Sequence, residues 1–400
     1  MVHALPPVTG HPVHLLIMFN WSKIFALRIL SRPRRGKRTR QRYRTVIFKV
    51  DAIGDFVIAL SVIRCLIRKY GEEHCCLVVS SVAAELAARE FPAAHHVVVA
   101  VPPYGGLVHH MLPQLLRDRR TLSAIEGDHL VSLRHQRSDC HNLLLSWIRA
   151  GRTYGLEDHQ PVWMNSYTRT RLNYSFTDTI MVPPPNTKSD AADGALCREL
   201  QLHKALATRV LGREITTEEI IPSFASVQPT SGEVLLAAPF SGDPIKDYPQ
   251  EQFVRCLVAI HAETPLPILL AGSPSQHDAL HSMFAALERK GVMPIELCGD
   301  LSVADYVERV AEAKAVLTMD SSTAHIAAAF DKPTVAILGG GHYGQFAPWH
   351  RSGCQVWLTH SMDCFQCDWH CMHPEPYCIT RIEPADVCRT MKRLLQGREK

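Results

Sequence analysis

Residues 315–340 are AVLTMDSSTAHIAAAFDKPTVAILGG, and they predict one complete strand–helix–strand unit. The apolar run at 315–319 is typical of a buried strand. A polar turn from Asp320 to Thr323 follows it, and an Ala-rich helix leads past Pro333 into a second apolar strand. Two consecutive strands joined through a helix lie parallel in one sheet. The stretch therefore indicates an α/β domain with a polar turn at the carboxyl end of a strand, where open α/β sheets bind ligands.

The same alternation of strands and helices extends in both directions. TVIFKV at 45–50 is typical of a buried strand, and the apolar-periodic segment at 56–70 predicts a helix. A Pro-rich loop at 182–194 separates this first series from the second. We expect two Rossmann-like domains with mainly parallel sheets, at 45–228 and 229–400, facing one another across a cleft. The remaining predicted elements are strands at 75–81, 95–102, 233–242, 267–273 and 295–300 and helices at 83–90, 195–211 and 250–263.

The composition is that of a folded protein, because 46% of the 400 residues are hydrophobic and 20% are charged. A net charge of +4 excludes a polycation that coats nucleic acid, so no nucleic-acid partner is expected.

The cysteines and the N-terminus indicate where the protein is located. Five of the 13 cysteines follow residue 360 and the rest are scattered, whereas the cysteines of a secreted disulfide scaffold are spread regularly through a short chain. The first cation, Lys23, follows the apolar run at 15–19, which is not the order of a secretory signal. With no uncharged stretch long enough to span a bilayer, we expect a cytoplasmic protein.

Residues 1–44 differ from the rest of the chain. An apolar segment ends at Leu30, and the run at 31–44 has eight Lys or Arg and no acidic residue. An apolar helix followed by cations is attracted to an anionic leaflet, which predicts peripheral attachment to the cytoplasmic face of the inner membrane. A disordered leader, or a start codon assigned too far upstream, explains the same composition. Both interpretations stay open at this point.

The polar turn after residue 319 can bind an anion. Backbone N–H groups at the start of a helix have no helical partner and attract phosphate, and Ser321 and Ser322 add hydroxyl donors. His325, one helical turn further on, could supply another donor. Ordinary capping of a helix by Ser or Asp gives the same pattern, so these residues alone are compatible with either a phosphate site or a cap.

The stretch around this turn resembles the family 9 glycosyltransferases, which include the lipopolysaccharide heptosyltransferases. That family has Asp-Thr-Gly-x-x-His after a strand, then an Ala-rich helix and Lys-Pro. The positions that match are Asp320, Ser321, Ser322 and His325, followed by Lys332-Pro333. The resemblance implies a GT-B fold, and it assigns binding of the diphosphate of a nucleotide-sugar donor to the first four positions.

A second segment, VDAIGDFVIALSVIRCLIRKYG at 50–71, resembles the family's first motif of a strand, Gly-Asp and an apolar helix. The resemblance makes Asp55 the general base. A carboxylate at a cleft edge can accept the proton of an attacking hydroxyl. Gly54 would let a substrate approach the backbone closely. The alternatives are an Asp that caps the helix and a glycine that only serves the turn.

A third segment, FSGDPIKDYPQEQF at 240–253, is similar to the family's Lys-x-Trp/Tyr-Pro segment. This similarity makes Lys246 a ligand of the donor phosphate. Gly339 and Gly340, after the second strand quoted above, are candidates for lining the substrate cleft beside the phosphate. A strand-end turn explains these glycines equally well.

A group of cysteines lies near the carboxyl end, within fifteen residues of one another. They are Cys364, Cys367, Cys371 and Cys378. Two thiolates with two residues between them can converge on one ion, so the spacing is compatible with a structural zinc or iron. Packing thiols that hold no metal are the alternative.

The resemblance as a whole implies an inverting, metal-independent glycosyltransferase. It would move a heptose-like sugar from an ADP-sugar to a hydroxyl of a glycan or glycolipid acceptor such as lipopolysaccharide core, with no cofactor needed for catalysis. Departures from the family pattern at Ser61, Ser322 and 338–349 leave the donor open. The alternatives are a non-heptose donor, a protein acceptor, or a catalytically silent relative that acts as a binding or scaffold protein. A dehydrogenase is disfavoured because the first strand is not followed by Gly-x-Gly-x-x-Gly.

Overall fold

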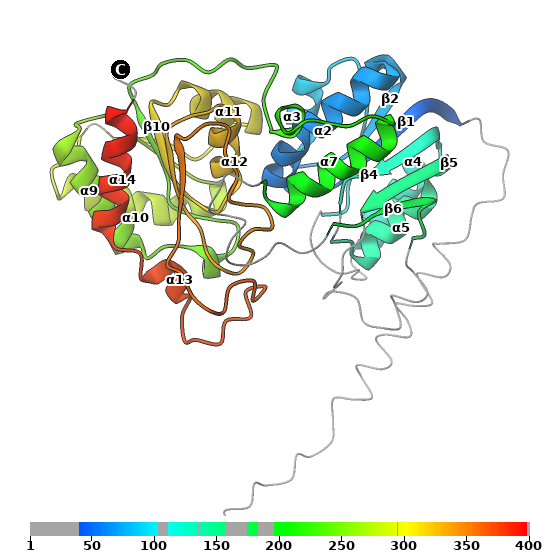
Figure 1. Ribbon diagram of the computed structural model, residues 1–400. Helices are drawn as coiled ribbons and strands as arrows, with labels where there is room; N and C mark the ends of the chain where they lie inside the picture. Colours follow the sequence, from blue (N-terminus) through cyan, green and yellow to red (C-terminus); the bar gives the residue numbers. More distant parts are fainter. Residues whose placement is uncertain are drawn as a thin grey trace, which may run out of the picture.

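The protein structure is a computed structural model that describes residues 40–102, 111–134, 136–156, 174–182, 196–293 and 295–397. Over these ranges the chain forms two α/β domains that lie side by side (Figure 1). Each domain contains a sheet of six parallel strands. The predicted pair of Rossmann-like domains is therefore confirmed.

The first domain is a doubly wound sheet with the strand order β3-β2-β1-β4-β5-β6. In the central strand, Ile47 belongs to one buried cluster while Val46 and Phe48 belong to another, because side chains alternate between the two covered faces. The strands are β1 (Gln41–Lys49), β2 (Cys75–Ser80), β3 (His95–Val99), β4 (Ile125–Ser132), β5 (Arg149–Leu156) and β6 (Asp178–Ile180). The helices are α2 (Ile53–Tyr70), η1 (Glu72–His74), α3 (Ala84–Glu90), α4 (Leu112–Leu122), α5 (Asp139–Trp147), α7 (Arg198–Leu211) and α8 (Thr217–Ile220).

Strand β1 begins at Gln41, four residues before the start of the strand predicted at 45–50. Gln41 pairs with Ile125 and Tyr43 with Gly127 in the parallel ladder with β4, and this pairing extends the strand into the basic run. Arg42 forms an exposed ion pair with Asp128 at 2.7 Å. The last part of the basic run therefore belongs to the sheet. The predicted leader helix lies outside the described residues.

The second domain has the strand order β12-β11-β10-β7-β8-β9. Val316 of β10 faces a core that continues into the first domain, whereas Leu317 faces a core confined to the second. The strands are β7 (Leu235–Ala238), β8 (Ile268–Ala271), β9 (Ile295–Cys298), β10 (Ala315–Met319), β11 (Thr334–Ile337) and β12 (Gln355–Leu358). The helices are η3 (Pro244–Lys246), α9 (Gln250–Glu263), η4 (Pro274–Gln276), α10 (His277–Glu288), α11 (Val303–Glu312), α12 (Ser322–Ala329), α13 (Tyr377–Thr380) and α14 (Pro384–Gln396).

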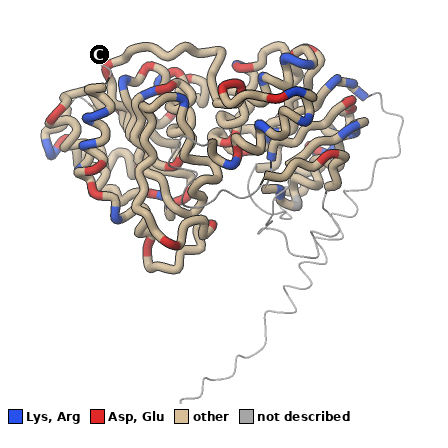
Figure 2. The backbone as a smooth tube through the Cα atoms, viewed as in Figure 1, with Lys and Arg blue, Asp and Glu red and all other residues tan. Residues whose placement is uncertain are grey.

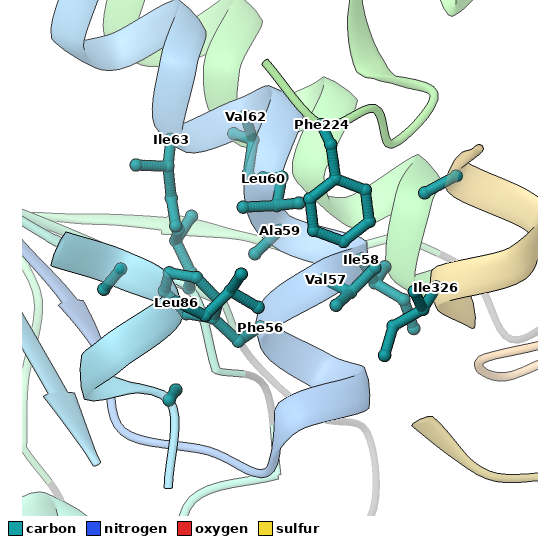
Figure 3. Close-up of a cluster of buried hydrophobic side chains, with 14 of the residues drawn as sticks. Phe56, Val57, Ile58, Ala59, Leu60, Val62, Ile63, Leu86, Phe224 and Ile326 are labelled. Carbon is teal, nitrogen blue, oxygen red and sulfur yellow. The ribbon is translucent and has the colours of Figure 1, made fainter. Parts of the chain in front are cut away.

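Helix α2 is apolar around most of its circumference, and this explains how the two domains join. A helix with apolar residues on all sides must be covered on all sides. Figure 3 shows Val57 and Ile58 of α2 beside Ile326 of α12, in a buried cluster that contains residues of both domains. Phe224 stacks on Phe330, with 4.4 Å between ring centroids. The start of α2 is thereby held against the start of α12.

Lys, Arg, Asp and Glu are interspersed over both domains (Figure 2), as the small net charge leads one to expect. At the β6 edge of the first sheet, Asp178 forms ion pairs with Arg152 of β5 and Arg209 of α7. Among the helices of the described ranges, none is both long and apolar enough to cross a bilayer.

Candidate functional site

The first turns of α2 and α12 meet at the contact between the two domains. A side-chain carbon on Gly54 would lie 3.1 Å from Cδ2 of His325 and 3.3 Å from Cα of Ser322. A side chain at this position would be tightly packed, so the close approach favours glycine on the α2 side. Two sequence motifs separated by more than 260 residues are brought together in this way.

Asp55 is the third residue of α2 and is partly exposed. The N-cap of the helix is Ala52, so the alternative that Asp55 caps the helix is wrong. A carboxylate in the first turn still interacts favourably with the positive end of the helix dipole. This position places Asp55 one residue beyond Gly54, at the edge of the contact with α12.

A buried charge cluster supports this side of the site, and sequence reasoning missed it. Lys49, at the end of β1, is 1% exposed, and its Nζ lies 2.9 Å from Asp51 and 3.5 Å from Glu199 of α7. Burial acts to lower the pKa of Lys49, but the carboxylates of Asp51, Glu199 and Asp55 outweigh it, and the pKa is raised. Arg134 also pairs with Asp51, and the two cations lower the pKa of that carboxyl against the effect of its burial.

The donor-side residues predicted from the third segment and from the polar turn also meet. Lys246 Nζ lies 3.6 Å from Oδ2 of Asp320, and the pair keeps partial exposure, 21% for the lysine and 11% for the aspartate. The same ammonium lies 5.0 Å from the centroid of the Trp369 ring, at cation–π distance. Lys246 is thus held between a carboxylate and an aromatic ring at the mouth of the site.

Ser321 occupies the N-cap position of α12, but its side chain makes no capping hydrogen bond. Its hydroxyl lies 3.2 Å from that of Thr318 instead. Capping by the Ser321 side chain, the alternative to a phosphate site, is therefore not what the structure shows. Ser322 N lies near the other domain, since it would be 3.7 Å from a side-chain carbon on Gly54. Backbone N–H groups at a helix start can bind an anion.

His325 is buried beneath this turn. The indole N–H of Trp349 donates to its Nδ1 at 3.1 Å, and the Trp357 ring lies against it with 5.7 Å between centroids. The pKa of His325 is lowered to about 4, mainly by burial, which outweighs the opposing effect of Asp320 and is assisted by Lys246. The imidazole is consequently neutral near pH 7.

The comparisons with known proteins point to one family. The family model described as Glycosyltransferase family 9 (heptosyltransferase) matches residues 204–372. Lipopolysaccharide heptosyltransferase 1 of Pseudomonas aeruginosa is 27% identical over 143 residues, which are 32% of this chain and 38% of that protein. Lipooligosaccharide heptosyltransferase 2 of Campylobacter jejuni is 23% identical over 143 residues, or 35% of this chain and 44% of that protein. The chain thus spans less than half the length of these curated relatives.

Residues 204–372 thus resemble a family 9 glycosyltransferase domain. An Escherichia coli heptosyltransferase solved with ADP has a TM-score of 0.61 to this structure at 16% identity, over 88% of this chain and 100% of that one. This likeness covers both domains and shows the GT-B fold. The family 9 match includes Lys246 and the turn at Asp320, while Asp55 lies before its first residue.

The glycines after β11 are covered by aromatic rings. A side-chain carbon on Gly339 would lie 2.3 Å from the Trp369 ring, and one on Gly340 would lie 2.3 Å from the Phe365 ring. Gly341 faces the Trp369 ring in the same way. The glycines make room for these rings, so the space beside them is not open for a phosphate. The prediction that Gly339 and Gly340 line the cleft has no support from this packing.

His342, which follows the glycines, meets Asp368 of the loop that carries these rings, and Lys246 acts on the His342 ring. Sequence reasoning missed both residues. His342 Nε2 lies 2.6 Å from Asp368, and the Trp369 indole N–H donates to His342 Nδ1 at 3.2 Å. Gln366, Asp368 and Trp369 have φ of 66°, 50° and 61°, in the left-handed region that non-glycine residues rarely adopt. The signal in the sequence was the departure of 338–349 from the family's common loop.

The four clustered cysteines are thiols that line one apolar pocket together with Phe365 and Trp369. Burial raises the pKa of the Cys367 and Cys378 thiols, which favours the protonated form over a thiolate ligand. Cys378 Sγ accepts a hydrogen bond from Gly340 N at 3.3 Å. In the described part of the chain, no three His, Cys, Asp or Glu side chains are placed to hold a metal. The predicted zinc or iron at Cys364, Cys367, Cys371 and Cys378 is therefore not supported.

Proposed function

We propose that the protein is an inverting glycosyltransferase that transfers a heptose from an ADP-sugar to a hydroxyl of a lipopolysaccharide-core-like acceptor. One observation carries the proposal: the first turn of α2, which bears Asp55, lies against the first turn of α12, and Lys246 lies beside Asp320 just before that turn. Each domain contributes to one site, as transfer between two substrates requires.

The donor side has the chemistry to bind a nucleoside diphosphate. Lys246 supplies a positive charge that is partly exposed, so its ammonium can leave its ion pair with Asp320 and bind a phosphate instead. The N-terminus of α12 supplies backbone N–H donors. The related E. coli heptosyltransferase was solved with ADP, which makes ADP the first nucleotide to test.

In the proposed reaction, the acceptor oxygen attacks the anomeric carbon as Asp55 takes its proton. The new C–O bond forms on the face opposite the departing diphosphate, and the bond from the anomeric carbon to the diphosphate oxygen breaks with its electron pair on that oxygen. A single displacement of this kind inverts the anomeric centre. Lys246 and the donors at the start of α12 stabilise the charge that develops on the leaving group.

The first domain offers a surface that suits a glycolipid acceptor. Leu112 and Leu116 lie one turn apart on α4 and are 45% and 47% exposed, with Arg117 and Arg120 exposed beside them. Apolar side chains flanked by cations favour the boundary of an anionic membrane. This surface supports a place for the protein on the cytoplasmic face of the inner membrane.

Titration calorimetry with ADP-, UDP-, GDP- and CMP-sugars tests the donor proposal. We expect binding of the ADP-sugar and, with a lipopolysaccharide-core acceptor, release of ADP. Binding without turnover on any acceptor would favour a catalytically silent relative, and no binding would overturn the proposal. Vesicle co-sedimentation of the full chain and of a chain lacking residues 1–39 separates the leader from α4 as membrane contacts.

A further inference from the structure

The Trp349 side chain fixes which ring nitrogen of His325 carries the proton. Trp349 is fully buried, and its N–H lies 3.1 Å from His325 Nδ1. The two ring planes are parallel to within 2°, with 6.1 Å between their centroids, and the indole N–H is within hydrogen-bonding distance of that nitrogen. An indole nitrogen is only a donor, and Nδ1 must therefore be an acceptor without a proton.

A neutral imidazole has one N–H, so His325 carries its proton on Nε2. The charged groups that act on the ring come from two segments: Asp320 after β10 and Lys246 of η3. Lys246 favours the neutral ring and Asp320 opposes it, while burial dominates. The ring is thus an uncharged donor near pH 7.

The edge of the ring that bears Nε2 faces the proposed reaction centre. Cδ2, the carbon bonded to Nε2, is the atom that a side-chain carbon on Gly54 would meet at 3.1 Å. Ser322 at the start of α12 lies against the same position at 3.3 Å. The Nε2 edge therefore lies between the two motif turns, while Trp349 lies at the opposite, Nδ1 edge.

We propose that Trp349 is a positioning residue, which holds His325 as a neutral Nε2–H donor to an oxygen of the departing diphosphate. This inference rests on the proposed function for its ligand and on the Trp349–His325 hydrogen bond for its tautomer. A donor that is already oriented gains most when the oxygen acquires charge in the transition state. A neutral donor serves this role without competing with Lys246 for Asp320.

Long-range proton–nitrogen NMR of the histidine-labelled full chain tests the tautomer without any substrate. In the wild type we expect the His325 signals of the Nε2–H form at pH 7. Trp349→Phe keeps the ring but removes the donor, so the Nδ1–H form should gain population. Trp357→Phe is the matched control, because it removes a neighbouring indole N–H that bonds to the Trp349 carbonyl instead. An Nδ1–H or doubly protonated wild-type ring, or an unchanged tautomer in Trp349→Phe, would overturn the proposal.

Two substitutions of His325 test which nitrogen matters. The amide nitrogen of Gln lies near the position of Nε2 and that of Asn near Nδ1, so His325→Gln should keep turnover within about tenfold of wild type while His325→Asn loses about a hundredfold. Equal losses would contradict the inference. If the wild type binds no nucleotide, the proposed function and the diphosphate partner both fail, and the NMR result still decides the role of Trp349.

The pKa of His325 gives a further readout. A hydrogen bond to the neutral form of a histidine lowers its pKa, so its loss in Trp349→Phe should raise the pKa of His325. We expect the NMR titration of His325 to move to higher pH by about one unit in Trp349→Phe and to stay in place in Trp357→Phe. An unchanged pKa of His325 in Trp349→Phe would contradict the inference.

Discussion

Lys49 and Lys246 are both paired with carboxylates at the same site, yet their surroundings differ. Lys49 is 1% exposed and fixed between Asp51 and Glu199, whereas Lys246 is 21% exposed and touches one carboxylate and the face of Trp369. A buried ammonium with two carboxylate partners cannot leave them without a large desolvation cost. One that is partly exposed can exchange its partner for a phosphate. The first lysine therefore belongs to the framework and the second to the binding surface.

The largest expected effect is on stability at the buried lysine. Lys49→Met leaves Asp51 and Glu199 buried without this cation, and we expect the free energy of unfolding to fall by about 3–5 kcal/mol. Lys246→Met, the matched substitution at the partly exposed lysine, should cost about 1 kcal/mol or less. Urea unfolding of both variants measures the difference. Similar losses in the two variants would erase the distinction between framework and binding surface.

The next effect concerns the carboxylate that the Lys49 cluster supports. Asp55→Asn should lower turnover on the order of a hundredfold, because an amide cannot accept the acceptor's proton, while ADP affinity and the thermal midpoint change little. Asp305→Asn is a suitable control, since Asp305 is likewise the third residue of its helix, α11. Steady-state kinetics decide the outcome, and near-normal turnover in Asp55→Asn would end its assignment as the base.

A smaller effect is expected on nucleotide binding. Lys246→Met should weaken ADP binding about tenfold at low salt, and the loss should shrink as ionic strength rises, because the interaction is between charges open to solvent. Lys290→Met removes an exposed lysine elsewhere in the second domain and should leave the affinity unchanged. Calorimetry at two salt concentrations measures both variants. An unchanged affinity in Lys246→Met would place the diphosphate elsewhere.

The smallest effect is a pH dependence that sharpens the same contrast. The folded pKa of Asp51 is lowered by Arg134 and Lys49, so its contribution to stability is present above the unfolded pKa of about 3.9 and is lost as pH falls through the folded pKa. The deficit of Lys49→Met relative to wild type should therefore narrow below about pH 4, where the carboxylates become protonated. Unfolding curves at pH 7 and pH 3 test this, and a constant deficit would argue against a charge effect.

The sequence predicted what depends on local pattern. The helix expected at 250–263 coincides with α9, since its apolar spacing is amphipathic and Pro249 stands at its start. The turns at Asp55 and Asp320 were located by motif, and the structure brings them together. Whether Asp55 caps its helix depended on where the helix starts, and the observed N-cap, Ala52, lies three residues before Asp55.

What escaped prediction depends on contacts between distant segments. Lys49 ends an apolar strand, and nothing nearby in sequence announces Glu199 as its partner. Likewise, the meeting of Trp369 with Lys246 requires the left-handed backbone at 366–369, which non-glycine residues adopt only when the surrounding structure enforces it. The start of β1 was missed because its pairing with β4, rather than its own hydrophobicity, extends it.

The packing of rings onto glycines after β11 has an evolutionary consequence. Gly339 and Gly341 leave space for Trp369, and Gly340 leaves space for Phe365. A single mutation that adds a methyl group to the glycine segment collides with a ring, and one that shrinks a ring leaves a void, so each change is unfavourable alone. The two segments should therefore vary together in descent. A lineage that acquires side chains at 339–341 must first or simultaneously give up the large rings at 365 and 369, and with Trp369 it gives up the aromatic support of Lys246.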